Sequence, residues 1–189
     1  SVAFVWDNSG SVSSFSHMTY AALDDFAASI RPDSEEVMLA VFSTQGARFL
    51  LPDWSGSVEE VTRALNAYNR GDGSSEAGAA VTAVNAELSD RRGSRAILLI
   101  TDAEFGYSNN PEVWRSIAST GVQIFTMHVS STSDGPARWW MQDVASAHGG
   151  YFASTPTYAD LETAFDRADC HIRQPKPYSV SVGYRDYTP

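Results

Sequence analysis

The sequence predicts an α/β fold: a doubly wound, mostly parallel sheet with one antiparallel hairpin strand and helices on both faces. Short apolar runs alternate along the chain with segments that carry apolar residues at helical spacing, as in β-α units. The run at 95–102 is apolar almost throughout, as expected of a central strand buried on both faces. The strands expected at 37–42 and 48–51 are joined by too few residues for a parallel crossover, so we expect them to pair antiparallel.

The first expected helix follows a strand at 2–6 and ends where Pro32 interrupts the pattern. Its apolar residues recur at the spacing of one buried helix face: Phe15, Met18, Ala22, Leu23, Phe26 and Ile30. A second helix begins at Ser57, a capping residue with Glu60 three positions later. A third helix follows the Gly- and Ser-rich loop at 69–75. Its narrow inward face consists of small and aliphatic residues: Ala77, Ala80, Val81, Val84 and Leu88.

The middle of the second half contains two further helices around one strand. Asn110-Pro111-Glu112 is typical of a helix start, because Asn caps a helix and Pro suits its first position, and Gly121 ends this helix. The next helix follows a buried strand at 122–129, opens at Asp134-Gly135-Pro136 and closes at Gly149-Gly150. Three side chains of this helix are expected to face inward: Trp140, Val144 and Ala147.

The end of the chain divides into a last β-α unit and a tail. A short strand at 151–153 precedes a helix capped by Thr157. The tail at 174–189 contains a Pro-Lys-Pro linker and then alternating residues, which predict an extra edge strand or the start of a following domain. We therefore expect one domain at 1–173.

Length, composition and charge exclude several classes of protein. The chain has 189 residues, 43% of them hydrophobic, enough for one domain with a sizeable core. No apolar run approaches the length of a membrane span, and the net charge of −10 disfavours nucleic acid and anionic membranes as partners. Cys170 is the only cysteine, so no internal disulfide forms. Because the chain lacks an initial Met and enters a strand at once, we expect a domain of a larger multidomain protein.

Asp7-Asn8-Ser9-Gly10-Ser11 carries the most informative polar pattern in the chain. It lies between the first strand and the first helix, at the edge of an α/β sheet where ligands bind. A carboxylate and two hydroxyls on one short loop are hard oxygen ligands that suit Mg²⁺. The alternative is a helix cap, since Asp and Ser are common at that position without any metal.

Two further loops bring matching residues to the same edge. Ser75 lies at the start of a helix, and Asp102 follows the central strand. Together with the Asp-x-Ser-x-Ser loop, they make the chain resemble the von Willebrand factor type A domain over residues 2 to about 172. That family's metal-ion-dependent adhesion site uses Asp-x-Ser-x-Ser, a Thr before a helix, and Asp in a Thr-Asp-Gly turn. In this chain Ser75 replaces the Thr, and Ala103 replaces the Gly.

The resemblance implies one divalent cation, Mg²⁺ or alternatively Mn²⁺ or Ca²⁺, at five residues: Asp7, Ser9, Ser11, Ser75 and Asp102. It aligns Ser75 with the coordinating Thr, and Ser74, one residue out of register, is the alternative ligand. Three residues are expected at the rim of the ligand-binding surface: Asp72, Ser74 and Glu104. With hydroxyls as direct ligands and the acids acting through water, such a cation stays electrophilic.

The function implied is a non-enzymatic protein-binding module whose cation binds an Asp or Glu side chain of a partner protein. Two alternatives remain open on the residues alone. One is a metal-dependent hydrolase or phosphotransferase, although the Gly-rich loop lacks the Lys that cradles phosphate. The other is a structural domain that has lost its metal. The family occurs on cell surfaces, in secreted proteins and inside cells, and the sequence only slightly favours an extracellular or cell-surface location.

Overall fold

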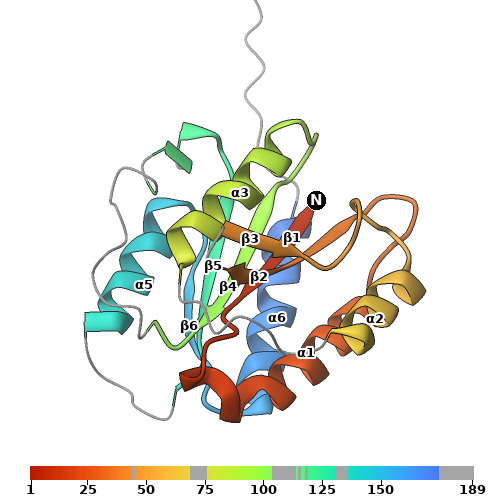
Figure 1. The fold of residues 1–189 in the computed structure, drawn as a ribbon. Helices are drawn as coiled ribbons and strands as arrows, with labels where there is room; N and C mark the ends of the chain where they lie inside the picture. The colour runs from red at the N-terminus through yellow and green to blue at the C-terminus, as the bar shows by residue number, and fades with distance from the viewer. Residues whose placement is uncertain are drawn as a thin grey trace, which may run out of the picture.

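The fold is described here from a computed structural model, which describes residues 1–43, 46–68, 76–103, 114, 116–117, 119–130 and 136–174. Its centre is a six-stranded sheet with the order β3-β2-β1-β4-β5-β6 (Figure 1). The strands are β1 (Val2–Trp6), β2 (Val37–Ser43), β3 (Gly46–Phe49), β4 (Ala96–Thr101), β5 (Gln123–His128) and β6 (Phe152–Ser154). All neighbouring strands run parallel except β2 and β3, so the predicted fold class is confirmed.

The hairpin strand lies earlier in the chain than the sequence predicted. We expected it at 48–51, whereas β3 spans Gly46–Phe49. The reason is the register: Ser43 pairs with Gly46, so pairing resumes after only two intervening residues. Gly46 has a φ of +112°, which a glycine adopts without steric cost.

Helices cover both faces of the sheet. They are the 3₁₀ turn η1 (Ser11–Phe15), α1 (Ser16–Ala28), α2 (Val58–Ala67), α3 (Ala77–Ser89), α5 (Pro136–Ala147) and α6 (Tyr158–Arg173). Figure 1 shows α1, α2 and α6 on one side of the sheet and α3 and α5 on the other. On the first side, the rings of Phe4, Phe26 and Phe165 pack edge to face, with Phe4–Phe26 centroids 4.7 Å apart.

The inward faces of the helices are mostly those that the sequence spacing predicted. The five apolar positions expected on the inner face of α3 are all fully buried, as are Leu161 and Ala168 of α6. Ala147 of α5 is an exception, because it is exposed while Ala145 and His148 are buried. The buried positions at this end of the helix are therefore Val144, Ala145 and His148, while Ser146 and Ala147 face outward.

The end of α5 shows why two successive glycines follow it. Gly149 has a φ of +66°, and the N–H groups of Gly149 and Gly150 donate to Ser146 O and Ala145 O, as in a Schellman cap. A Cβ atom on Gly150 would lie 1.9 Å from the carbonyl oxygen of Ile124. Only glycine at position 150 therefore allows the chain to approach β5 this closely.

Some sequence-based predictions fall on residues outside those described. They are the helix start at 110–112, the loop at 69–75, the helix opening at 134–135 and the tail beyond residue 174. Within the described segments, no helix combines the length and the apolar character needed to cross a bilayer.

Candidate functional site

The candidate site begins where β1 and β4 end side by side. Trp6 pairs with Ile100 in parallel register, and the N–H of Asp7 donates to the carbonyl of Ile100 at 2.9 Å. Asp7 therefore follows β1, and Asp102 follows β4, at the same carboxyl edge of the sheet. This is the edge at which open α/β sheets bind ligands.

The loop after β1 is organised by its own polar side chains. Oδ1 of Asp7 accepts the backbone N–H of Ser9 at 2.8 Å. The hydroxyl oxygens of Ser9 and Ser11 lie 3.0 Å apart. Asp7 and Ser9 are buried, with 5% and 7% of their surface exposed, whereas Ser11 is exposed. The loop thus brings together one carboxylate and two hydroxyls. Asp7 and Ser9 lie below the surface, and Ser11 is accessible from outside.

The helix-cap alternative does not describe this loop. The residue capping η1 is Gly10, and the residue capping α1 is Phe15. Neither cap makes a side-chain hydrogen bond to the helix that follows. None of Asp7, Ser9 and Ser11 is therefore the N-cap residue of these helices.

Thr101 joins the two halves of the site. Its hydroxyl donates to Oδ2 of Asp7 at 2.7 Å and accepts the backbone N–H of Ala103 at 2.8 Å. Ala103 has a φ of +55°, in the left-handed region that favours glycine. The sequence marked Thr101 only as part of the family's Thr-Asp-Gly turn and gave it no role of its own, because a threonine at the end of an apolar strand resembles an ordinary β-branched strand residue.

His128 supports the second acidic loop from the neighbouring strand. It is 4% exposed, and its Nε2 lies 3.2 Å from the backbone oxygen of Asp102. Since a carbonyl oxygen only accepts, Nε2 carries the proton in this contact. The sequence indicated a buried histidine here, and the structure adds that this histidine holds the loop of Asp102.

An aromatic cluster flanks the loop after β1. The rings of Trp6, Tyr20 and Tyr68 pack edge to face, with centroids 5.8 to 6.2 Å apart. The amide of Asn8 donates to the Tyr68 hydroxyl at 3.2 Å. This contact fixes Asn8, the residue between Asp7 and Ser9, against the aromatic cluster.

The electrostatics of Asp7 favour a nearby positive charge. Burial raises the pKa of its carboxyl group above the ordinary value, and the charge of Asp102 adds to that effect. Hydrogen bonds from Ser9 and Thr101 oppose this rise in pKa by stabilising the ionised form. Two neighbouring buried carboxylates with adjacent hydroxyls fit a hard divalent cation by the chemistry of their oxygen donors.

The predicted site residues divide into two sets. Asp7, Ser9, Ser11 and Asp102 lie at one sheet edge, whereas the remaining four predicted residues lie outside the described segments: Asp72, Ser74, Ser75 and Glu104. In the part of the chain that is described, no group of three or more His, Cys, Asp or Glu side chains could hold a metal ion. A metal at this edge would therefore depend on serine hydroxyls, and the full ligand set stays a prediction.

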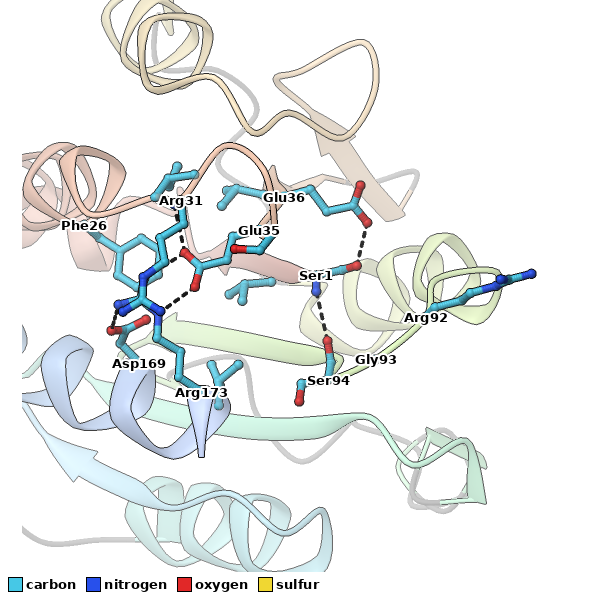
Figure 2. Close-up of a pocket in the computed structure, with 15 residues that line it drawn as sticks. Ser1, Phe26, Arg31, Glu35, Glu36, Arg92, Gly93, Ser94, Asp169 and Arg173 are labelled. Carbon is cyan, nitrogen blue, oxygen red and sulfur yellow. Dashed lines mark hydrogen bonds and ion pairs between the residues drawn. The ribbon is translucent and has the colours of Figure 1, made fainter. Parts of the chain in front are cut away.

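A cavity of about 310 Å³ lies at the opposite, amino edge of the sheet. Figure 2 shows Arg173 pointing toward Glu35 and Asp169 in this cavity, with ion pairs to both. Glu35 and Asp169 are thus already paired with Arg173, and the cavity includes none of the residues predicted for the metal. We therefore assign it a structural role.

Comparison with solved structures identifies similar folds at low sequence identity. BatB from Bacteroides thetaiotaomicron has a TM-score of 0.74 and 16% identity, covering 90% of this chain and 97% of that chain. An aerotolerance-related membrane protein from Bacteroides fragilis has a TM-score of 0.73 with the same identity and coverage. Likeness at this identity shows the fold alone.

A third similar structure is proximal thread matrix protein 1 from the mussel byssus, with a zinc-occupied MIDAS motif. Its TM-score is 0.73 at 14% identity, covering 88% of this chain and 46% of that chain. The comparison with curated proteins found no match. The family model of the von Willebrand factor type A domain matches residues 1–167. The chain therefore belongs to the von Willebrand factor type A domain family.

Proposed function

We propose that this domain is a non-enzymatic protein-binding module that uses a divalent cation, Mg²⁺ or Mn²⁺, to bind an acidic side chain of a partner protein. Domains of this family are generally interaction modules without enzymatic activity. The observation that carries the proposal is the arrangement of Asp7. Both of its oxygens accept hydrogen bonds, and the paired hydroxyls of Ser9 and Ser11 lie beside it.

The residues have different roles in this proposal. The hydroxyls of Ser9 and Ser11, with that of Ser75, are the direct ligands, and Asp7 and Asp102 act through water. The bound cation supplies an electrophilic position that accepts a partner carboxylate. Since Oδ1 and Oδ2 of Asp7 already accept protein donors, its carboxylate keeps its orientation without contacting the metal. The zinc-occupied MIDAS motif of the mussel protein supports a divalent cation at such a site.

The surroundings of the proposed cation decide which partner it accepts. The residues proposed for the rim are Asp72, Ser74 and Glu104, two of them acidic, and the chain carries a net charge of −10. An acidic partner therefore gains nothing from the general surface. At the cation itself attraction wins, because distant charges are screened over about 8 Å at physiological salt.

The proposal also covers the organisation of the chain. We propose that residues 1–173 form the binding domain and that 174–189 form a linker and an extra strand or the start of a following domain. The module then belongs to a larger protein, in line with the mussel chain, of which this chain covers only 46%.

Calorimetric titration with Mn²⁺ and Mg²⁺ tests the metal site. We expect a binding isotherm for the wild-type protein and none for Asp7→Ala, because the variant removes the buried carboxylate that orients the loop. Asp90→Ala is the matched control, since it removes one exposed acid after α3, outside the carboxyl-edge loops. Equal isotherms for all three proteins would show that any metal binds elsewhere.

Capture of a partner tests the second half of the proposal. Binding should require the divalent ion, fail in chelator, and fail when one particular partner carboxylate is replaced by its amide. Loss of the contact should lower the binding free energy by about 2–5 kcal/mol, since a buried charge loses its counter-charge. A partner held equally well in chelator and by Asp7→Ala would show that another surface binds it.

A further inference from the structure

We infer that Thr101 is a positioning residue of the metal site, and that its single hydroxyl fixes the orientation of both acidic groups. This inference rests on the proposed metal-binding function. Thr101 lies at the last position of β4 and is fully buried. Its hydroxyl contacts the carboxylate of Asp7 on one side and the backbone of Ala103 on the other.

The direction of the two hydrogen bonds follows from the groups involved. The backbone N–H of Ala103 only donates, so the Thr101 oxygen accepts it at 2.8 Å. The hydroxyl proton is then left for Oδ2 of Asp7, 2.7 Å away. The other carboxylate oxygen accepts the N–H of Ser9 at 2.8 Å. One donor on the loop after β1 and one at the end of β4 therefore fix the plane of the Asp7 carboxylate.

The same hydroxyl closes the turn that carries Asp102. The hydrogen bond from the N–H of Ala103 to the Thr101 hydroxyl spans the turn. Ala103 has a left-handed backbone conformation, which is unfavourable for alanine. The backbone of Thr101 also accepts the N–H of Val129 at 3.1 Å, which fixes the turn to β5. Loss of the hydroxyl would therefore release the Asp7 carboxylate and the Asp102 turn together.

The test compares two substitutions at this position by Mn²⁺ titration. Thr101→Val keeps the shape and removes the hydroxyl, and we expect it to weaken Mn²⁺ binding by about 10- to 100-fold, as loss of a group that orients metal ligands does. Thr101→Ser keeps the hydroxyl and should retain most of the wild-type affinity. A purely structural role would instead give both variants the wild-type dissociation constant.

Thr126→Val is the matched control. Thr126 is also fully buried, and its hydroxyl donates to the carbonyl of Met141 at 2.9 Å, away from the carboxyl edge. Because the same change removes the same kind of buried hydrogen bond, its cost in thermal stability should be similar. Its Mn²⁺ affinity should equal that of the wild type. An equal loss of affinity in Thr126→Val would overturn the role of Thr101.

The outcomes separate this inference from the function on which it rests. If wild-type protein binds no Mn²⁺, the proposed function is wrong and the inference fails with it. If wild type and Thr101→Val bind Mn²⁺ equally, only the inference is wrong. If Thr101→Val does not fold, a crystal structure of the Mn²⁺-loaded wild type decides: the bond from Thr101 to Asp7 must persist, and its absence would overturn the inference.

Discussion

The backbone of Ala103 is the residue-scale feature that most clearly departs from ordinary geometry. Its φ of +55° places an L-amino acid in a region where the Cβ atom crowds the backbone. The family pattern has glycine at the corresponding position, and glycine adopts this conformation without that cost. The chain retains the left-handed turn even though the residue is unfavourable, because the bond from Ala103 to Thr101 holds it.

Replacement of Ala103 by glycine should therefore stabilise the protein. Relief of the left-handed strain is worth about 1–2 kcal/mol, and the greater entropy of the unfolded glycine chain offsets about 0.4–1 kcal/mol of it. We expect Ala103→Gly to raise the free energy of unfolding in urea by up to about 1.6 kcal/mol, the difference between these two effects. Ala86→Gly, within α3, makes the same chemical change and should lower that free energy by about 0.5–1 kcal/mol. A lower free energy of unfolding in Ala103→Gly than in wild type would contradict the backbone strain at Ala103.

Spacing in the sequence identified some site residues directly, whereas the role of Thr101 needed the structure. Asp7, Ser9 and Ser11 were recognisable because three oxygen donors follow one strand at alternate positions. Thr101 was recognised only as part of the family's Thr-Asp-Gly turn, because its role depends on which atoms lie opposite its hydroxyl, and that depends on the pairing of β1 with β4. The family pattern did mark Ala103 as a departure, although only the structure shows the strain.

At the scale of elements, one ion-pair cluster fixes the end of α6. Nε and Nη2 of Arg173 donate to the two carboxylate oxygens of Glu35 at 2.6 and 2.7 Å, and Nη2 also donates to the carbonyl of Ser29 at 3.1 Å. Glu35 additionally accepts the backbone N–H of Arg31 at 3.0 Å. The last turn of α6 is thereby joined to the end of α1 and to the segment before β2 (Figure 2).

This cluster predicts a dependence of stability on pH. Burial disfavours the charge of Glu35, but hydrogen bonds from Arg173 and Arg31 outweigh it and hold the pKa of Glu35 below its ordinary value of 4.5. Since the folded pKa is the lower one, the stabilisation is complete above the unfolded pKa and is lost as the pH falls through the folded pKa.

Glu35→Gln should therefore lower the free energy of unfolding by about 1–2 kcal/mol at pH 7, as expected for the loss of charged hydrogen bonds that are partly exposed. The difference in free energy of unfolding between wild type and variant should become smaller as the solution is acidified below pH 4.5. Urea unfolding at each pH measures it. Glu59→Gln is the control, because Glu59 forms an exposed pair with Arg63, which is worth at most about 1 kcal/mol. A difference in free energy of unfolding that does not change with pH would contradict the stabilising role of the ionised Glu35.

Element types were predictable from the sequence, whereas some boundaries were not. The capping residues Ser57 and Thr157 were identified correctly, since each accepts the N–H three residues later. The hairpin strand was placed two residues too late, because Gly46 and Ala47 pair with Ser43 and Phe42 although the apolar pattern does not mark them as strand residues. Ala147 was misassigned because His148 is buried instead, with hydrogen bonds to the carbonyls of Val144 and of the distant Trp114.

At the scale of the whole molecule, the two edges of the sheet have different roles. The first and last described residues, Ser1 and Gln174, lie at the amino edge near the Arg173 cluster, as Figure 1 shows for the N-terminus and α6. The carboxyl edge holds Asp7 and Asp102. A partner that approaches the carboxyl edge therefore meets neither end of the described domain.

The central claim is that one divalent cation binds at the carboxyl edge of the sheet. Anomalous diffraction from crystals of the wild-type protein grown with Mn²⁺ tests it most directly. The account predicts an anomalous peak within direct coordination distance of the hydroxyls of Ser9 and Ser11, with Asp7 and Asp102 one water further away. No peak at that edge in excess Mn²⁺, or a peak only at another surface, would contradict it.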